Sequence, residues 1–244
     1  MRTFITKKTV TSLLHHRLFF PLILGCHLIH PSTGGALAFS SLNEMPTTTR
    51  FITNRMCPYA QKAWLALELD GRDYTLEEIS LYGPNGKPDF FWELNPAGTV
   101  PVMVSCNDVV CDSEDILDYL NVDGEDTDGG EGGEEGVAYW RSLVKNKISP
   151  VGKRAVFASD PTELFALLVG NEDAGGGVDG KIVGPYLCGA VPSSADCAAF
   201  PFFWRIESEF GFPAECNKLK SWLNTCLSNP KFKKTVQKSW WWWW

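Results

Sequence analysis

Cys57 is the residue of this sequence whose type and position best suit covalent chemistry. It precedes Pro58 at the expected start of an amphipathic helix that runs to Leu69 and is ended by Gly71. Proline is favoured in the first turn of a helix, so Cys57 falls at the N-cap, where free N–H groups and the helix dipole favour an anion. Such a position can lower a thiol pKa from about 8.5 to roughly 3.5–7.5 and yield a nucleophilic thiolate. A cysteine that only caps the helix is the alternative.

Val100 and Pro101 could hold a peptide-like ligand. They stand where a strand is expected to begin, a place compatible with a cis peptide bond. In that arrangement the N–H and C=O groups of Val100 are free to pair with an extended peptide ligand. The pattern therefore indicates a backbone contact for such a ligand at Val100.

Asp112 and Ser113 begin another expected helix, after a hairpin turn at Asn107 and Asp108. A carboxylate and a hydroxyl at a helix start can hold an α-amino and an α-carboxylate group together, because the helix N–H groups donate to the anion while Asp112 binds the cation. Plain helix capping is the alternative. The position one hairpin after Pro101 favours the ligand interpretation.

Two domains are needed to position these residues. Short β-type runs, at 50–53 and 74–79, alternate with helical ones in the first domain, which we place at 47–122. Residues 137–238 are predominantly helical. Between them Asp123–Glu135 holds seven acidic residues and five glycines, a composition that cannot bury apolar surface, so we expect a solvated linker over 123–136. A further loop is expected at 171–180. Residues 239–244 are expected to be an exposed tryptophan tail, and a segment that docks on a partner or a membrane surface is the alternative.

Residues 1–46 are predicted to be a targeting leader. Residues 1–43 contain no acidic residue and enclose an apolar stretch, 18–29, of twelve residues, which is too short to span a bilayer. Ala36 and Ala38 suit cleavage, which would leave Phe39 at the new N-terminus, as in the bipartite plastid-import signals of algae with secondary plastids. A secretory signal or an unstructured leader is the alternative. We expect no permanent membrane span.

Composition excludes several classes of function. All four histidines fall in the first 30 residues, so a mature form lacking them has neither a histidine-dependent nucleophile nor a histidine-bound metal. A net charge of −7 without a basic stretch argues against nucleic-acid binding.

Most of the eight cysteines are expected to be small buried hydrophobes. A buried core is likewise the favoured role of the aromatic residues in the helical half: Trp140, Phe157, Phe202, Phe203 and Trp204.

Four segments resemble cytosolic-type glutathione transferases, specifically the branch with an active-site cysteine. Residues 57–64 resemble the lambda-class and omega-class signature, 87–101 the omega-class segment, and 112–116 the lambda and dehydroascorbate-reductase pattern. Ser193–Asp196 fits the family's capping box. The resemblance covers roughly 49–238. It implies an α/β thioredoxin-like N-terminal domain followed by an all-α C-terminal domain, with glutathione as co-substrate and no metal.

The resemblance also implies a role for each site residue. Cys57 would be the nucleophile and Lys87 would meet the glycyl carboxylate of glutathione, although an exposed loop lysine is the alternative for Lys87. Val100 and Pro101 would contact the cysteinyl unit of glutathione, and Asp112 and Ser113 would contact its γ-glutamyl end.

Ala60 bears on the reaction, because a dithiol oxidoreductase would have its resolving cysteine at that position. A Cys57–glutathione disulfide must then be resolved by a second glutathione. This predicts thiol transfer, deglutathionylation or dehydroascorbate reduction, with a small-molecule or protein disulfide as partner. The alternative is a non-catalytic carrier of apolar small molecules between the domains. A third interpretation is that the protein is a soluble form of a membrane-inserting relative of this fold. Only the N-terminal apolar run supports it.

Overall fold

The computed structural model describes residues 48–82, 86–106, 108–123, 133–170 and 177–237. The expected leader, most of the acidic linker, the first part of the 171–180 loop and the tryptophan tail lie outside the described residues.

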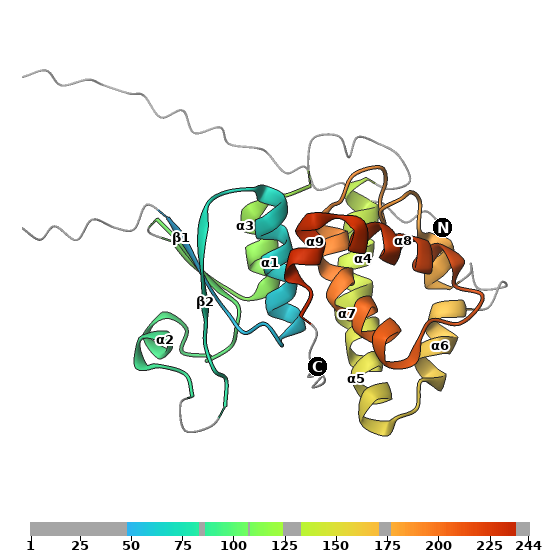
Figure 1. The fold of residues 1–244 in the computed structure, drawn as a ribbon, viewed down its shortest axis with the longest axis horizontal. Helices are drawn as coiled ribbons and strands as arrows, with labels where there is room; N and C mark the ends of the chain where they lie inside the picture. Colours follow the sequence, from blue (N-terminus) through green and yellow to red (C-terminus); the bar gives the residue numbers. More distant parts are fainter. Residues whose placement is uncertain (1–47, 83–85, 107, 124–132, 171–176, 238–244) are drawn as a thin grey trace, which may run out of the picture. The chain divides into compact units, whose positions relative to one another are not determined.

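A four-stranded mixed sheet underlies the first half of the chain (Figure 1). Its order is β2-β1-β3-β4, with β1 and β2 parallel and the other pairs antiparallel. Parallel neighbours need a crossover, which helix α1 supplies. Successive residues alternate between faces, so Phe51 and Ile52 enter two different hydrophobic clusters. The strands are β1 (Thr49–Thr53), β2 (Tyr74–Glu78), β3 (Val102–Ser105) and β4 (Asp108–Cys111).

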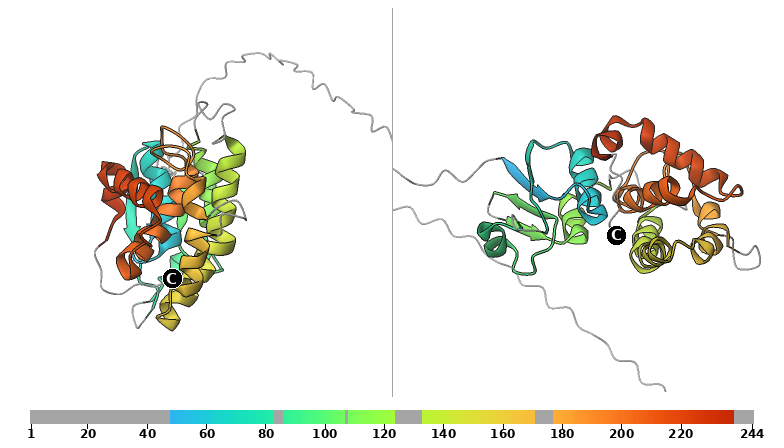
Figure 2. Two further views of the ribbon diagram at one scale, coloured as in Figure 1. Left: turned by 90° about the vertical axis from the view of Figure 1, so that its right-hand side faces the viewer. Right: turned by 60° about the horizontal axis from the view of Figure 1, so that its bottom comes forward.

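Helices α1 and α3 cover one face of this sheet, and α2 lies on the other (Figures 1 and 2). The arrangement confirms the predicted thioredoxin-like domain followed by a helical one. A π-helical turn, η2 (Val144–Ile148), joins α4 to α5, and a 3₁₀ turn, η4 (Val178–Lys181), precedes α7. The helices are α1 (Pro58–Asp70), α2 (Asp89–Leu94), α3 (Ser113–Leu120), α4 (Glu134–Leu143), α5 (Ser149–Ala158), α6 (Thr162–Val169), α7 (Ser194–Phe210), α8 (Asn217–Ser228) and α9 (Pro230–Thr235).

Helix α1 is buried on every side rather than amphipathic, which corrects the expectation from its sequence. It packs against α3 on the sheet side and against α7 and α9 of the helical half. Pro58 and every residue from Ala60 to Leu67 are buried. The expected ends are confirmed: Pro58 is the first helical residue, and Gly71 ends the helix with φ +81°, a conformation that glycine adopts without steric cost.

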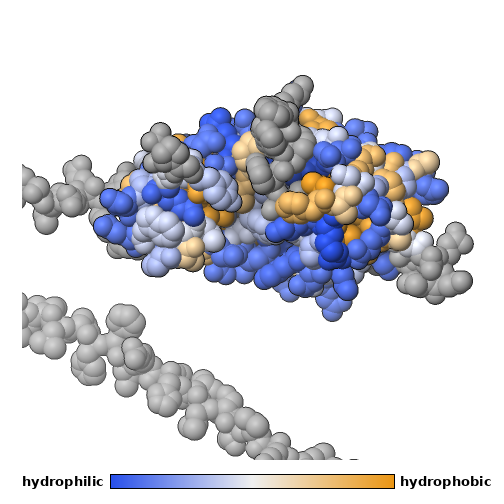
Figure 3. Space-filling view, turned by 90° about the horizontal axis from the view of Figure 1, so that it is seen from below, coloured by the Kyte–Doolittle hydropathy of each residue, from blue (hydrophilic) through white to orange (hydrophobic). Residues whose placement is uncertain are grey.

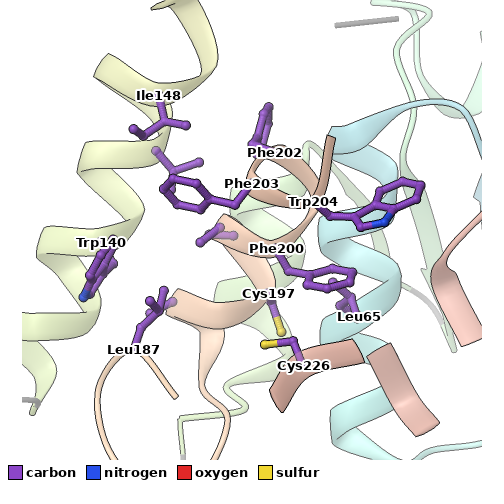
Figure 4. Close-up of a cluster of buried hydrophobic side chains, with 14 of the residues drawn as sticks. Leu65, Trp140, Ile148, Leu187, Cys197, Phe200, Phe202, Phe203, Trp204 and Cys226 are labelled. Carbon is purple, nitrogen blue, oxygen red and sulfur yellow. The ribbon is translucent and has the colours of Figure 1, made fainter. Parts of the chain in front are cut away.

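A single hydrophobic cluster extends from the sheet through α1 into the helical half. Figure 4 shows its centre, where aromatic side chains of α7 project toward α1 and toward α4. Trp140, Phe202, Phe203 and Trp204 are buried as predicted, whereas the prediction for Phe157 is wrong, because it is 71 % exposed. Helix α5 buries the face that carries Ala155, and a residue two positions later points to the opposite side.

The predicted capping box at the start of α7 is present. Ser193 N–H donates to the Asp196 carboxylate at 2.9 Å, and the reciprocal bond from the Asp196 N–H to the Ser193 side chain also forms. Asp196 additionally accepts from Leu187 N–H at 2.9 Å and from Trp222 Nε1 at 2.7 Å. Asp123, which the sequence interpretation assigned to the solvated linker, accepts from Ser194 N–H at 2.5 Å and Oγ at 2.6 Å. The first residue of that segment therefore anchors α7.

Hydrophobic residues on the face seen in Figure 3 form patches separated by hydrophilic surface. Within the described residues, no helix combines the length and the apolar character that crossing a membrane requires.

Candidate active site

Cys57 is the N-cap residue of α1, as predicted. The loop that presents it is held at both ends, because Cys57 N–H donates to Asn54 O and the Asn54 amide donates to Ile79 O, each at 3.0 Å. Asn54 Oδ1 also accepts from Met56 N–H at 3.0 Å. These bonds fix the turn between β1 and α1 against the end of β2. The thiol is therefore carried on a rigid support.

The pKa of the Cys57 thiol is raised above its ordinary value, mainly because burial disfavours the thiolate. The N–H groups of Ala60 and Tyr59 and the positive charge of Arg205 act in the opposite direction. The thiol itself makes no capping hydrogen bond, so those N–H groups are available to a thiolate. The predicted lowering of this pKa is thus wrong in direction, since the argument from the helix terminus left out burial.

A cavity of about 260 Å³ opens beside Cys57. One wall comes from the start of α1, including Tyr59, and the other from the segment after β2. The Tyr59 hydroxyl hydrogen-bonds the Ser149 hydroxyl of α5 at 2.7 Å, and its ring packs edge-on against Phe202 at 5.4 Å. Tyr59 thus connects this wall of the cavity to the helical half. Its lining residues are Asn54, Met56, Cys57, Pro58, Tyr59, Ser80, Leu81 and Tyr82.

Val100 and Pro101 lie at the same end of the sheet as Cys57. Ile52 pairs with Val102, so the segment leaving β1 toward Cys57 runs beside the segment entering β3. The Val100–Pro101 bond is cis, as the sequence suggested. Among the described residues, none hydrogen-bonds the backbone N–H or C=O of Val100. Both groups are therefore available to an extended ligand.

Asp112 and Ser113 reach this end of the sheet through β4. Val102 pairs with Cys111, which brings Asp112 level with Pro101. Asp112 is exposed and caps α3, with its Oδ1 accepting Glu114 N–H at 2.8 Å, while Ser113 is buried. The carboxylate keeps a second oxygen for a cationic group. Capping and ligand binding are thus compatible at Asp112.

Lys87 lies on the α2 side of the site. Its Nζ sits 5.0 Å from the centre of the Trp92 ring, a cation–π contact. The same ring covers Gly98 so closely that an added Cβ would collide with it. Lys87 is therefore held against the loop that leads to Val100, and it does not line the cavity beside Cys57.

Arg205 belongs to this site and was missed from the sequence. It lies on α7, is 3 % exposed, and its Nη2 donates to the carbonyl of Met56, next to Cys57, at 3.3 Å. A charged residue inside the apolar run that follows Pro201 was the available signal, because arginine is rarely buried without a specific partner. Tyr59 was also missed, and nothing in its local sequence distinguishes it.

A buried ionic network links α1, α3 and α4. Glu114 pairs with Lys62 on one oxygen and with Arg141 on the other, the latter at 2.7 Å. Burial alone would raise the pKa of Glu114, but the two cations hold it below its ordinary value. Burial lowers the pKa of Lys62 against the effect of Glu114, and with the carboxylate in direct contact we expect Lys62 to be protonated at neutral pH. In the described part of the chain, no group of three potential metal ligands comes together.

Comparison with known proteins relates both the sequence and the fold to one family. A family model described as "Glutathione S-transferase, N-terminal domain" matches residues 56–122. A protein of Aplysia californica named "Probable glutathione transferase" is 41 % identical over 66 residues, which are 27 % of this chain and 68 % of that protein. "Glutathione S-transferase L1" of Arabidopsis thaliana is 28 % identical over 169 residues, 66 % of this chain and 67 % of that protein. The crystal structure of glutathione transferase Omega 3C from Trametes versicolor has a TM-score of 0.63 and 21 % identity, over 80 % of this chain and 91 % of that one.

Proposed function

Because this chain belongs to the glutathione transferase family, we propose that it is a glutathione-dependent thiol transferase whose nucleophile is Cys57. The observation that carries the proposal is the placement of Cys57 at the N-cap of α1, beside a cavity and next to the buried cation of Arg205. Transferases that conjugate glutathione activate its thiol with a hydroxyl group. A cysteine at that place competes as nucleophile and favours disulfide exchange.

In the first half of the proposed reaction, the Cys57 thiolate attacks the glutathione sulfur of a mixed disulfide. A Cys57–glutathione disulfide forms, and the other thiol leaves as its thiolate and takes up a proton. The unpaired backbone of Val100 and the free oxygen of Asp112 would hold the glutathione moiety during this exchange. The α1 N–H groups stabilise the sulfur anion before the attack.

In the second half, a glutathione thiolate attacks the glutathione sulfur of that intermediate. Oxidised glutathione forms and the Cys57 thiolate is released. Residue 60 is alanine, so no neighbouring cysteine on α1 competes for this step. Dehydroascorbate reduction is the second proposed activity, in which two glutathione molecules supply the two electrons and leave as oxidised glutathione.

The test is the Cys57→Ser variant, assayed for reduction of the mixed disulfide of glutathione with 2-mercaptoethanol. We expect loss of the activity with little change in stability, because serine is an equal or better N-cap residue. Mass spectrometry after incubation with oxidised glutathione should place a glutathionyl adduct on Cys57. Retention of most of the activity by Cys57→Ser would contradict the assignment of the nucleophile.

A non-catalytic carrier of apolar molecules is the second candidate. Two observations favour it: the raised pKa of Cys57, and the apolar side chains of Met56 and Leu81 that line the cavity. A carrier should fail the disulfide-reductase assay while binding an apolar fluorescent probe. It should also bind that probe unchanged after Cys57→Ser.

A further inference from the structure

Arg205 is a fully buried arginine at the boundary between the two halves of the chain. It lies on α7, five positions from the end of that helix and directly after Trp204, whose ring faces the guanidinium at 5.3 Å. Removing an arginine from water is costly unless specific acceptors meet its N–H groups. The position of those acceptors indicates what the residue does.

The acceptors connect Arg205 to the first turn of α1. Nη1 donates to Gln61 Oε1 and to Pro201 O, each at 2.6 Å, and Nη2 donates to Met56 O at 3.3 Å. Met56 immediately precedes Cys57. Gln61 is in turn fixed by α9, because its Nε2 donates to Thr235 Oγ1 at 3.2 Å. The guanidinium is therefore held by α1 and α7 directly, and by α9 through Gln61, against the segment that carries the thiol.

We propose that Arg205 is a positioning residue of this site, which fixes the Cys57 segment through Met56 and stabilises the Cys57 thiolate by its charge. The inference rests on the proposed function, in which that thiolate occurs twice. It attacks the disulfide in the first half of the reaction and is the leaving group in the second. A cation that stabilises it makes attack possible at a lower pH and release faster, since a thiol of lower pKa is the better leaving group.

The charges around Cys57 are compatible with this role. Burial lowers the pKa of Arg205 to about 10, with Cys57 acting against that change, so Arg205 is still a cation at neutral pH. From the turn before α1, Arg55 is paired with Glu78 of β2 at 3.0 Å. The remaining titratable side chains that line the cavity, Tyr59 of α1 and Tyr82 after β2, are phenols and not cations. Among the described residues, the guanidinium of α7 is thus the cation of the helical half whose charge acts on the thiol.

The test measures the rate at which iodoacetamide alkylates Cys57 between pH 6 and 10, with the product quantified by mass spectrometry. All proteins carry Cys106→Ser, because Cys106 is exposed and would react as well. We expect Arg205→Gln to slow alkylation about tenfold at a fixed pH below the thiol pKa, and to move the profile to higher pH. Arg205→Lys, which keeps a positive charge, should recover most of the rate. An unchanged profile in folded Arg205→Gln would overturn the proposal, and so would equal slowing by Arg205→Lys.

Gln61→Glu tests the charge of Arg205 while the arginine side chain itself stays in place. It has the same shape as the wild type and places a carboxylate on Arg205, which neutralises the charge and keeps the bond from Nη1, although the bonds from Gln61 Nε2 to Thr235 are lost. We expect it, too, to slow alkylation about tenfold. Arg141→Gln is the matched control, because it removes a partly buried arginine that contacts Glu114 and not the Cys57 segment. Its alkylation profile should equal that of the wild type, and a fast rate in folded Gln61→Glu would overturn the proposal.

The alkylation assay contains no glutathione, so the two proposals fail separately. If Cys57→Ser kept its disulfide-reductase activity, the proposed function would fail while the effect of Arg205 on the thiol could still be measured. If Cys57→Ser were inactive and the Arg205 variants had wild-type profiles, only the role of Arg205 would fail.

Discussion

The carboxylate of Asp112 accepts the backbone N–H of Glu114 at 2.8 Å, while the backbone of Asp112 itself has φ +77°. A positive φ is uncommon for a residue other than glycine, and aspartate and asparagine tolerate it best. Strained residues of this kind persist where the surrounding structure fixes them, often at ligand sites. Asp112 therefore combines a structural hydrogen bond with a backbone conformation that is often found at ligand sites.

Asp112→Asn separates the capping role from ligand binding. Asparagine keeps an oxygen for Glu114 N–H and tolerates the backbone, but it loses the charge that would pair with the α-amino group of glutathione. That contact is worth roughly 1.5–3 kcal/mol, or about one to two decades in affinity. It should be the same in ground and transition states, so steady-state kinetics should give a raised KM for glutathione and a nearly unchanged kcat.

Asp112→Ala should show the same KM effect and, in addition, a loss of about 1 kcal/mol of unfolding free energy, because the cap is removed. Urea denaturation of the two variants measures this difference. If Asp112→Asn kept the wild-type KM, Asp112 would be a cap only, and the γ-glutamyl end would bind elsewhere.

The raised pKa of Cys57 predicts the pH dependence of its alkylation in the absence of glutathione. With the thiol form predominant at neutral pH, the rate should rise about tenfold for each pH unit between pH 6 and 8. Mass spectrometry of the Cys106→Ser protein measures this rate. A rate already constant over that interval would restore the lowered pKa that the helix terminus alone predicts.

Glu114→Gln should destabilise the fold by about 3 kcal/mol, because it leaves the Lys62 ammonium buried without a carboxylate. The Glu114 pKa lies below its ordinary value of 4.5 in the folded protein. Its contribution is therefore complete above pH 4.5 and is lost as the pH falls through the folded-state pKa. Denaturation at several pH values should give a constant difference between variant and wild type at neutral pH, which shrinks in acid. A difference that persisted unchanged in acid would argue against the ionic origin.

Asp196→Asn should cost about 3 kcal/mol of unfolding free energy. Every partner of the carboxylate is a donor, including the N–H groups of Leu187 and Ser193 and the Trp222 indole, so an amide would turn its own NH₂ toward one of them. Trp222→Phe removes a single donor and should cost less, about 1–2 kcal/mol. Thermal denaturation of both variants measures which one loses more unfolding free energy. Equal losses would show that packing of the indole dominates.

Local signals in the sequence were enough to place helix α1 and the Val100–Pro101 turn. Proline and glycine at fixed positions determine where α1 begins and ends, and they act within a few residues. The environment of the thiol could not be found in this way. Arg205 reaches Met56 across 149 positions of the chain, and the burial that raises the pKa of Cys57 depends on how the two halves pack. A helix terminus can be predicted locally, whereas its effect on a thiol depends on tertiary contacts.

Helix α1 belongs to the hydrophobic core of both halves, with α3 on one side and α7 and α9 on the other. Neither half can complete the packing around it alone, so the two should unfold in one cooperative transition. Partial opening of α7 or α9 would remove the residues that hold the first turn of α1 before the sheet itself lost order. The reactivity of Cys57 should then respond to local unfolding in the distant helical half. A slow loss of thiol reactivity would be the first measurable sign that the protein is losing its structure.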